Sequence, residues 1–205
     1  GLESITIPES VTEIGEEAFQ NCSNLKAFYG KFASADNRCL VVDGVLISFA
    51  PKGLTSYSVP EDVTEIPDNC FKNWGIQDIT IPQTVVSIGE KAFEGCPISA
   101  INGEKGTLRL TDGFQIAADA FLNGSFQKVI LDVEKPRQLV KIAAAVGATK
   151  IIVRDTIDIN SLNQILAIPG VVSVSCLTTN KTVSSSTVEL REMPKTLRSL
   201  ELPQC

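Results

Sequence analysis

The side chains that most often carry out catalysis are few or poorly grouped in this sequence. None of the 205 residues is a histidine, so neither a Ser-His-Asp triad nor a Cys-His pair can be assembled. The tightest carboxylate groups are Glu16–Glu17 and Asp155–Asp158, at positions that the surrounding pattern leaves exposed. Carboxylates far apart in sequence can still pair as in a glycosidase. Nothing in the sequence points to such a pair, and we predict no catalytic residue and no enzymatic activity.

The cysteines also favour packing over chemistry. There are six of them, at Cys22, Cys39, Cys70, Cys96, Cys176 and Cys205. With no CxxC spacing and no histidine, a zinc site would need cysteines from distant parts of the chain or carboxylates. Free cysteine packs as a small apolar residue. We therefore expect no metal site, no cofactor and no disulfide.

The charge balance narrows the classes of partner. The formal net charge is -6 and the isoelectric point is about 4.8, with no segment that concentrates Lys and Arg. Such a chain is repelled on average by a nucleic-acid backbone and by an anionic membrane surface. No run approaches the roughly 18 apolar residues of a membrane-spanning helix. We expect neither nucleic-acid binding nor membrane insertion in this chain, and it shows no signal peptide.

The elements that would position a site come from an internal repeat. Three segments align without gaps over 18 residues: 2–19, 54–71 and 76–93. A degenerate fourth copy retains Ile116, Ala120 and Phe121. Self-similarity at this spacing is typical of proteins in which each repeat stacks on the next to form a continuous core.

Each repeat begins with a short strand. Ile5 and Ile7 alternate with polar residues, which is the pattern of a strand with one buried face. Pro8 ends the strand because it has no N–H for a further ladder bond. The paired Ala18 and Phe19 that close the repeat place a small residue beside a large one that fills the core.

The complete string from Ile5 to Leu25 closely resembles the BspA-like leucine-rich repeat family, and 79–98 carries it with the last spacing one residue shorter. The resemblance covers about residues 2–131. It implies a leucine-rich-repeat solenoid. It also implies a bacterial protein on the cell surface or secreted, because the family is best known for surface proteins that attach to host or extracellular-matrix proteins and to other microbes.

Two insertions interrupt the repeats. In the first, near 31–53, two apolar runs flank Asp43–Gly44, a strong signal for a two-residue β-hairpin turn. The second, near 103–113, follows its repeat at the same point and predicts a shorter hairpin of the same kind. The first domain thus comprises residues 1–131, with both hairpins inserted in it.

After residue 131 the signature disappears but the spacing persists. Strand-like runs at 129–131, 151–153 and 172–174 lie 22 and then 21 residues apart, with helix-like segments at 136–146 and 161–167 between them. We expect an α/β repeat in which residues 132–205 continue the solenoid as divergent strand–helix repeats. A separate small α/β cap is the alternative.

The outward positions of the stacked strands form two predicted columns, and solenoids commonly bind partners through such a face. The candidates are Thr6, Tyr29, Ser58, Thr80 and Asn102. Tyr29 is the strongest, since rigid amphipathic aromatics are frequent interface anchors. The sequence thus predicts a binding or adhesion module for a host or matrix protein, a glycan or another microbial surface. The alternatives are an enzyme with its site in the divergent C-terminal region, or a spacer that displays another domain.

Overall fold

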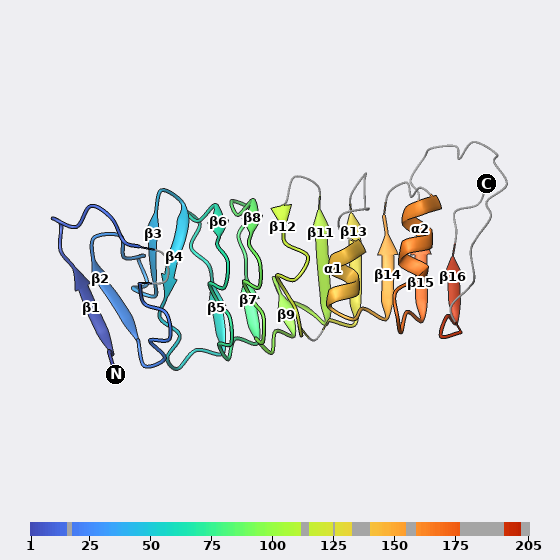
Figure 1. Cartoon of the computed structure of the whole chain (residues 1–205), viewed down its shortest axis with the longest axis horizontal. Coiled ribbons are helices and arrows are strands. Elements are labelled where there is room, and N and C mark those ends of the chain that lie inside the picture. The colour runs from blue at the N-terminus through green and yellow to red at the C-terminus, as the bar shows by residue number, and fades with distance from the viewer. Residues whose placement is uncertain are drawn as a thin grey trace.

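The computed structural model describes residues 1–15, 18–111, 115–124, 126–132, 140–154, 159–176 and 195–201. The chain is an elongated solenoid, with its strands arranged along the long axis from β1 (Ser4–Ile7) to β16 (Ser199–Glu201) (Figure 1). Strands predominate, and the described residues contain only two short helices. The leucine-rich-repeat solenoid expected from the sequence is therefore confirmed.

The first strand of each repeat forms one side of the solenoid. The strands on this side are β1, β2 (Ala27–Gly30), β5 (Ser56–Ser58), β7 (Asp78–Thr80) and β9 (Ala100–Ile101). β1 pairs with β2 in parallel as a separate two-stranded sheet, whereas β5, β7 and β9 pair in parallel with one another. Ile79 and its equivalents point inward, so the flanking residues face outward as the alternating pattern predicts.

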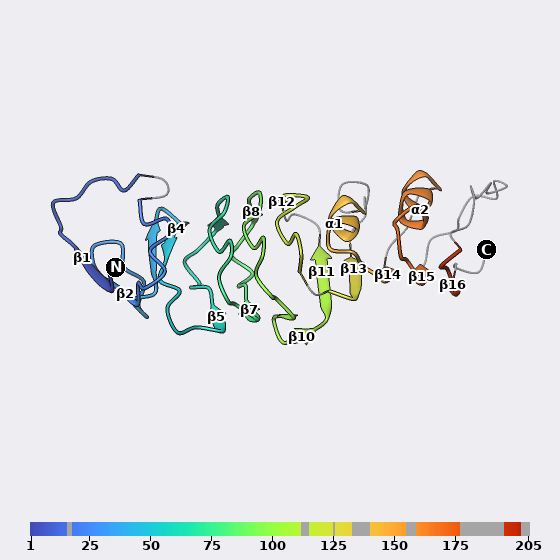
Figure 2. The ribbon, with the colours of Figure 1, turned by 60° about the horizontal axis from the view of Figure 1, so that its bottom comes forward.

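A second row of strands lies on the other side of the solenoid (Figure 2). Its members are β6 (Glu65–Ile66), β8 (Ser87–Ile88) and β12 (Gln115–Ile116), paired in parallel. Ile66 and Ile88 point into the core, whereas Glu65 is exposed. The sequence predicts no strand here, because two residues are too few to show an alternating pattern.

The first insertion is a hairpin, as predicted. β3 (Cys39–Val42) and β4 (Val45–Phe49) pair in antiparallel fashion around Asp43–Gly44. Both turn residues have positive φ, 49° and 83°, as a twisted two-residue turn requires. β4 pairs in parallel with β6, so the hairpin extends the second row of strands. It also separates two apolar clusters, since Leu40 belongs to the N-terminal cluster and Leu46 to the main core.

The second insertion differs from the prediction. Its hairpin spans 100–105, where β10 (Glu104–Lys105) pairs antiparallel with β9. The residues that follow form β11 (Thr107–Thr111), which joins a parallel sheet beside β13 (Lys128–Asp132). Leu108 and Leu110 explain the difference, because their alternating apolar side chains are buried in register with those of β13.

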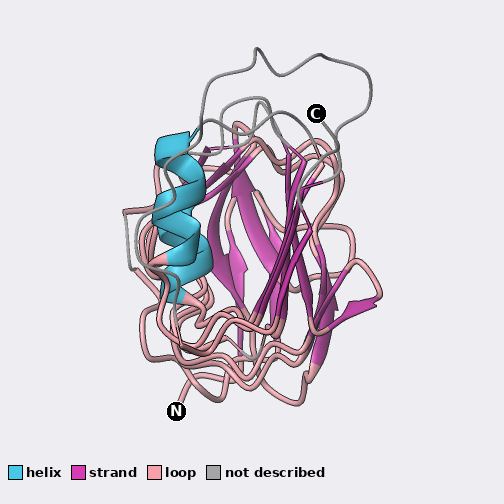
Figure 3. Cartoon of the chain, turned by 90° about the vertical axis from the view of Figure 1, so that its right-hand side faces the viewer, coloured by secondary structure: helices cyan, strands magenta, loops and turns pink. Residues whose placement is uncertain are grey.

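The parallel sheet continues to the end of the described chain. β14 (Lys150–Val153), β15 (Ser173–Cys176) and β16 follow β13 in order. α1 (Val140–Ala145) lies between β13 and β14 in the chain, and α2 (Ile159–Leu166) between β14 and β15. The helices occupy the side on which β6, β8 and β12 lie earlier in the chain (Figures 2 and 3). The first residues of the predicted helix at 136–146 lie outside the described residues, as does the segment after Glu201.

The phenylalanines that close the second, third and fourth repeats form a continuous stack. The rings of Phe71 and Phe93 are 5.0 Å apart and nearly parallel, and those of Phe93 and Phe121 are 4.9 Å apart. All three side chains are buried. Cys96 packs beside them and donates its thiol hydrogen to the carbonyl oxygen of Phe71 at 2.7 Å. The repeats are thus joined through ring faces as well as through backbone ladders.

Candidate functional site

The five residues predicted for binding are all exposed, but their strands belong to two separate sheets. Thr6 lies beside Tyr29 in the β1–β2 sheet, and Tyr29 is 45% exposed. Ser58 lies beside Thr80 in the sheet of β5, β7 and β9. Asn102 follows β9, and its Oδ1 accepts a hydrogen bond from the backbone N–H of Ile81 at 2.7 Å. The side-chain oxygen of Asn102 is therefore bound to the backbone immediately after β7.

Ser58 and Thr80 line a groove of about 480 Å³ on the outward face of the sheet. Its other lining residues are Asp36, Ser56, Tyr57, Asp78, Ile79, Ala100, Gly103 and Lys105. Hydroxyl groups, two carboxylates and one ammonium group thus surround a short stretch of apolar surface. Such a surface can form hydrogen bonds and ion pairs with a polar ligand without any group that must react with it.

The groove has walls that the repeat alone would not supply. Asp36 comes from the segment between β2 and β3, beyond the β5 edge of the sheet. Lys105 comes from β10, beyond the β9 edge, and lies directly opposite Ala100 in the antiparallel pair. Ala100 lies between Asp78 and Lys105 and is only 3% exposed, because strands flank it on both sides.

Hydrogen bonds around the groove hold its wall and floor in place. The hydroxyl of Ser34 donates to a carboxylate oxygen of Asp36 at 2.6 Å, and the backbone N–H of Arg38 donates to the same oxygen at 3.0 Å. The hydroxyl of Tyr57 lies 2.8 Å from the sulfur of Cys39. Burial, followed by the neighbouring Cys39, raises the pKa of Tyr57. The phenol is thus neutral in the folded chain and adds no charge to the groove.

Sequence reasoning missed Asp36, Gly103 and Lys105 because they belong to the insertions. A partial signal was present, since both insertions leave the repeat at the same point, immediately after an outward-facing strand. Their positions beside the face depend on how the insertions pack, which no local pattern encodes. The groove is therefore partly predicted: the repeat supplies Ser58 and Thr80, and the insertions supply its ends.

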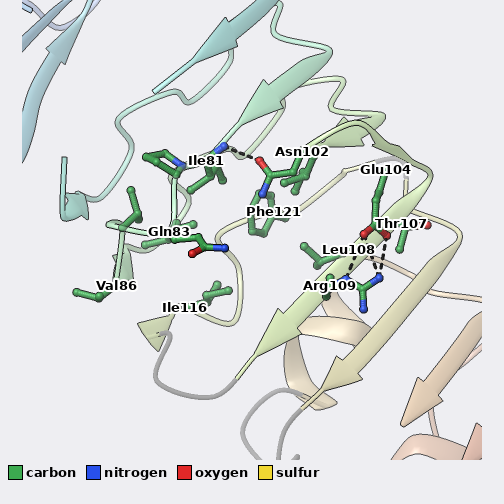
Figure 4. Close-up of a pocket in the computed structure, with 14 residues that line it drawn as sticks. Ile81, Gln83, Val86, Asn102, Glu104, Thr107, Leu108, Arg109, Ile116 and Phe121 are labelled. Carbon is green, nitrogen blue, oxygen red and sulfur yellow. Dashed lines mark hydrogen bonds and ion pairs between the residues drawn. The ribbon is translucent and has the colours of Figure 1, made fainter. Parts of the chain in front are cut away.

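A second hollow of about 460 Å³ lies where β9 and β10 give way to β11 (Figure 4). Its lining is mostly apolar and includes Ile81, Val86, Ile116 and Phe121. At one side Arg109 makes an ion pair with Glu104 at 3.0 Å. Val86 is 53% exposed here, unusually high for a large apolar residue. Residues 112–114, which lead from β11 to β12, lie outside the described residues.

Little in the described part of the chain suggests catalysis or metal binding. Within it, no three His, Cys, Asp or Glu residues are grouped so as to hold a metal ion. Burial raises the pKa of Cys39 to about 12 and that of Cys96 to about 11, so both remain thiols at neutral pH. The carboxylate groups at 16–17 and 155–158, and Cys205, lie outside the described residues. No described helix is long and apolar enough to cross a membrane.

The stacked parallel strands, their spacing and the ring stack define a leucine-rich-repeat solenoid. The profile of the family described as BspA type leucine rich repeat region matches residues 1–35 and 47–114, just over half of the chain, in six copies. The chain belongs to this family. The unmatched residues 36–46 include β3 and the turn that joins it to β4.

Two solved structures share the fold. A leucine rich cell surface protein from Faecalibacterium prausnitzii A2-165 aligns with a TM-score of 0.56 and 21% identity, over 80% of this chain and 50% of that one. The pneumococcal vaccine antigen PcpA aligns with a TM-score of 0.50 and 16% identity, over 97% of this chain and 50% of that one. This chain thus spans about half the length of each solved structure. No curated protein matches the sequence.

Proposed function

We propose that this chain is a non-enzymatic binding module that recognises a protein or glycan partner through the outward face of its strands. The observation that carries the proposal is the groove of about 480 Å³ on that face, bounded by Asp36 and Lys105. Its floor is rigid because it is made of paired strands over a stacked core. A rigid, preformed surface loses little conformational entropy when it binds a partner.

The same proposal extends to location and architecture. The similarity to a bacterial protein whose description places it on the cell surface supports a surface or secreted location for this chain. We also infer that residues 132–205 continue the solenoid as strand–helix repeats. The in-register parallel pairing of β13, β14 and β15, with α1 and α2 between them, supports this inference.

The test is a screen of the recombinant chain against arrays of matrix proteins and glycans, repeated with two variants. Thr80→Arg fills the groove from an exposed position, without disturbing the core. Thr84→Arg is the matched control, because Thr84 belongs to the same repeat, is exposed and does not line the groove.

We expect a partner whose binding is lost with Thr80→Arg and kept with Thr84→Arg. Equal binding by both variants would place the interaction elsewhere on the molecule. The absence of any binder, together with turnover of a substrate by the purified chain, would favour the enzyme alternative.

A further inference from the structure

We propose that the partner of the outward face is an anionic polysaccharide, held by a ladder of three lysines that begins at the groove. The inference rests on the proposed function and names its class of ligand. The ladder consists of Lys105, Lys128 and Lys150, from β10, β13 and β14. These three strands lie on the same side of the solenoid (Figure 2).

Backbone pairing sets the spacing of the ladder. Lys128 and Lys150 occupy equivalent positions on neighbouring parallel strands, which lie about 4.8 Å apart. Both point outward, because the next residue on each strand, Val129 or Ile151, is fully buried. The backbone N–H of Lys128 donates to the carbonyl of Gly106, the residue after Lys105, at 3.0 Å. Lys105 stands two residues before Thr107, the register partner of Lys128, so the three lysines follow one another from strand to strand on this side of the solenoid.

This arrangement is unusual for a chain with a net charge of -6. Like charges at opposed positions on neighbouring strands weaken a sheet. Among the ion pairs of the described residues, none involves these lysines, whereas the nearby Arg109 is paired with Glu104. A ligand with regularly spaced negative charges would remove the repulsion.

The groove identifies the polymer as a polysaccharide. Lys105 belongs to both surfaces, since it lines the groove that contains Ser58, Thr80 and Asp78. Hydroxyl and carboxylate groups suit the hydroxyls of a sugar residue, while the lysines suit the sulfate or carboxylate groups of the following residues. A nucleic acid fits less well, because the groove lining offers no exposed aromatic ring on which a base could stack. The hydroxyl groups of the groove and the lysines beyond it are thus neighbours through Lys105, which belongs to both.

The experiment measures the affinity of the intact chain for heparin by calorimetry, with neutral dextran as the uncharged comparison. The ladder variant carries Lys105→Gln, Lys128→Gln and Lys150→Gln. The control carries Lys52→Gln, Lys141→Gln and Lys195→Gln, which remove the same charge from exposed positions outside the ladder. Thermal unfolding verifies that each variant is folded, and Lys150→Gln alone serves if the triple variant is not.

We expect the ladder variant to bind heparin roughly 10- to 100-fold more weakly, and the control to remain within about threefold of the unmodified chain. An equal loss in both triple variants would show that only net charge matters and would overturn the inference. The inference would also be overturned if the chain did not bind heparin. The same holds if single-stranded DNA bound as tightly as heparin through the same three lysines. If heparin fails but the screen yields a partner sensitive to Thr80→Arg, the inference falls and the proposed function stands.

Discussion

The ring stack should contribute more to stability in the middle of the solenoid than at its N-terminal end. Phe93 is 1% exposed and stacks on two rings, those of Phe71 and Phe121. Phe19 occupies the same repeat position but is only half-buried, and it meets one ring, that of Phe28, edge-on at 5.2 Å. The same substitution at the two positions therefore removes different amounts of packing from an identical motif.

For Phe93→Ala we expect a loss of about 3–5 kcal/mol in the free energy of unfolding, because the buried ring leaves a cavity that rigid neighbours cannot close. Each lost ring pair accounts for about 0.5–1.5 kcal/mol of stabilisation. For Phe19→Ala, with one ring pair and partial exposure, we expect about 1–2 kcal/mol. Equilibrium urea unfolding followed by circular dichroism measures both. Equal losses, or less than about 1.5 kcal/mol for Phe93→Ala, would refute the reasoning.

Three further outcomes follow from single residues. Native Cys39, buried and with its pKa raised to about 12, should resist iodoacetamide under conditions that label the half-buried Cys22, and both should react in urea. Because the folded chain keeps the Cys39 proton while an unfolded thiol loses it near pH 8.5, stability measured by urea titration should fall as pH rises from about 8.5 toward 12. Gly30→Ala should lower stability by about 1–3 kcal/mol, since φ is 79° and the added methyl would collide with the carbonyl of Ile7. Gly103→Ala, with a similar φ of 76° and open space, should cost less in the same assay.

The repeat strands could be predicted from sequence because local and long-range signals agree there. Alternation around Ile79, the following proline and the closing Phe93 recur in several copies, so each copy supports the others. The Asp43–Gly44 hairpin was predictable for a different reason: both residues favour the positive φ that the turn requires. In each case, the residues themselves determine the backbone.

Other features depend on neighbours in space. In β13, alternation places Ile130 on the same face as Lys128, yet Ile130 is only 3% exposed. Its register places it between Arg109 and Ile152 on the adjacent strands, and large neighbours on both sides cover it. The alternating pattern of β13 shows which residues face outward, but it does not show which of these side chains are exposed to solvent and which are covered by neighbours. Exposure on a sheet is decided by cross-strand neighbours, which only the register reveals.

The groove follows the same rule at a larger scale. A stack of identical repeats gives a shallow face whose residues, such as Ser58 and Thr80, differ little from turn to turn. It becomes a bounded site only where the repeat is interrupted, because Asp36 and Lys105 come from the two insertions. The second insertion also leads into β11. Because β11 pairs with β13, Lys128 lies next to the end of this insertion's hairpin. The repeat thus supplies the rigid support, and we expect the insertions to determine which ligand is bound. A change in the length of either insertion should therefore alter specificity while the solenoid remains intact.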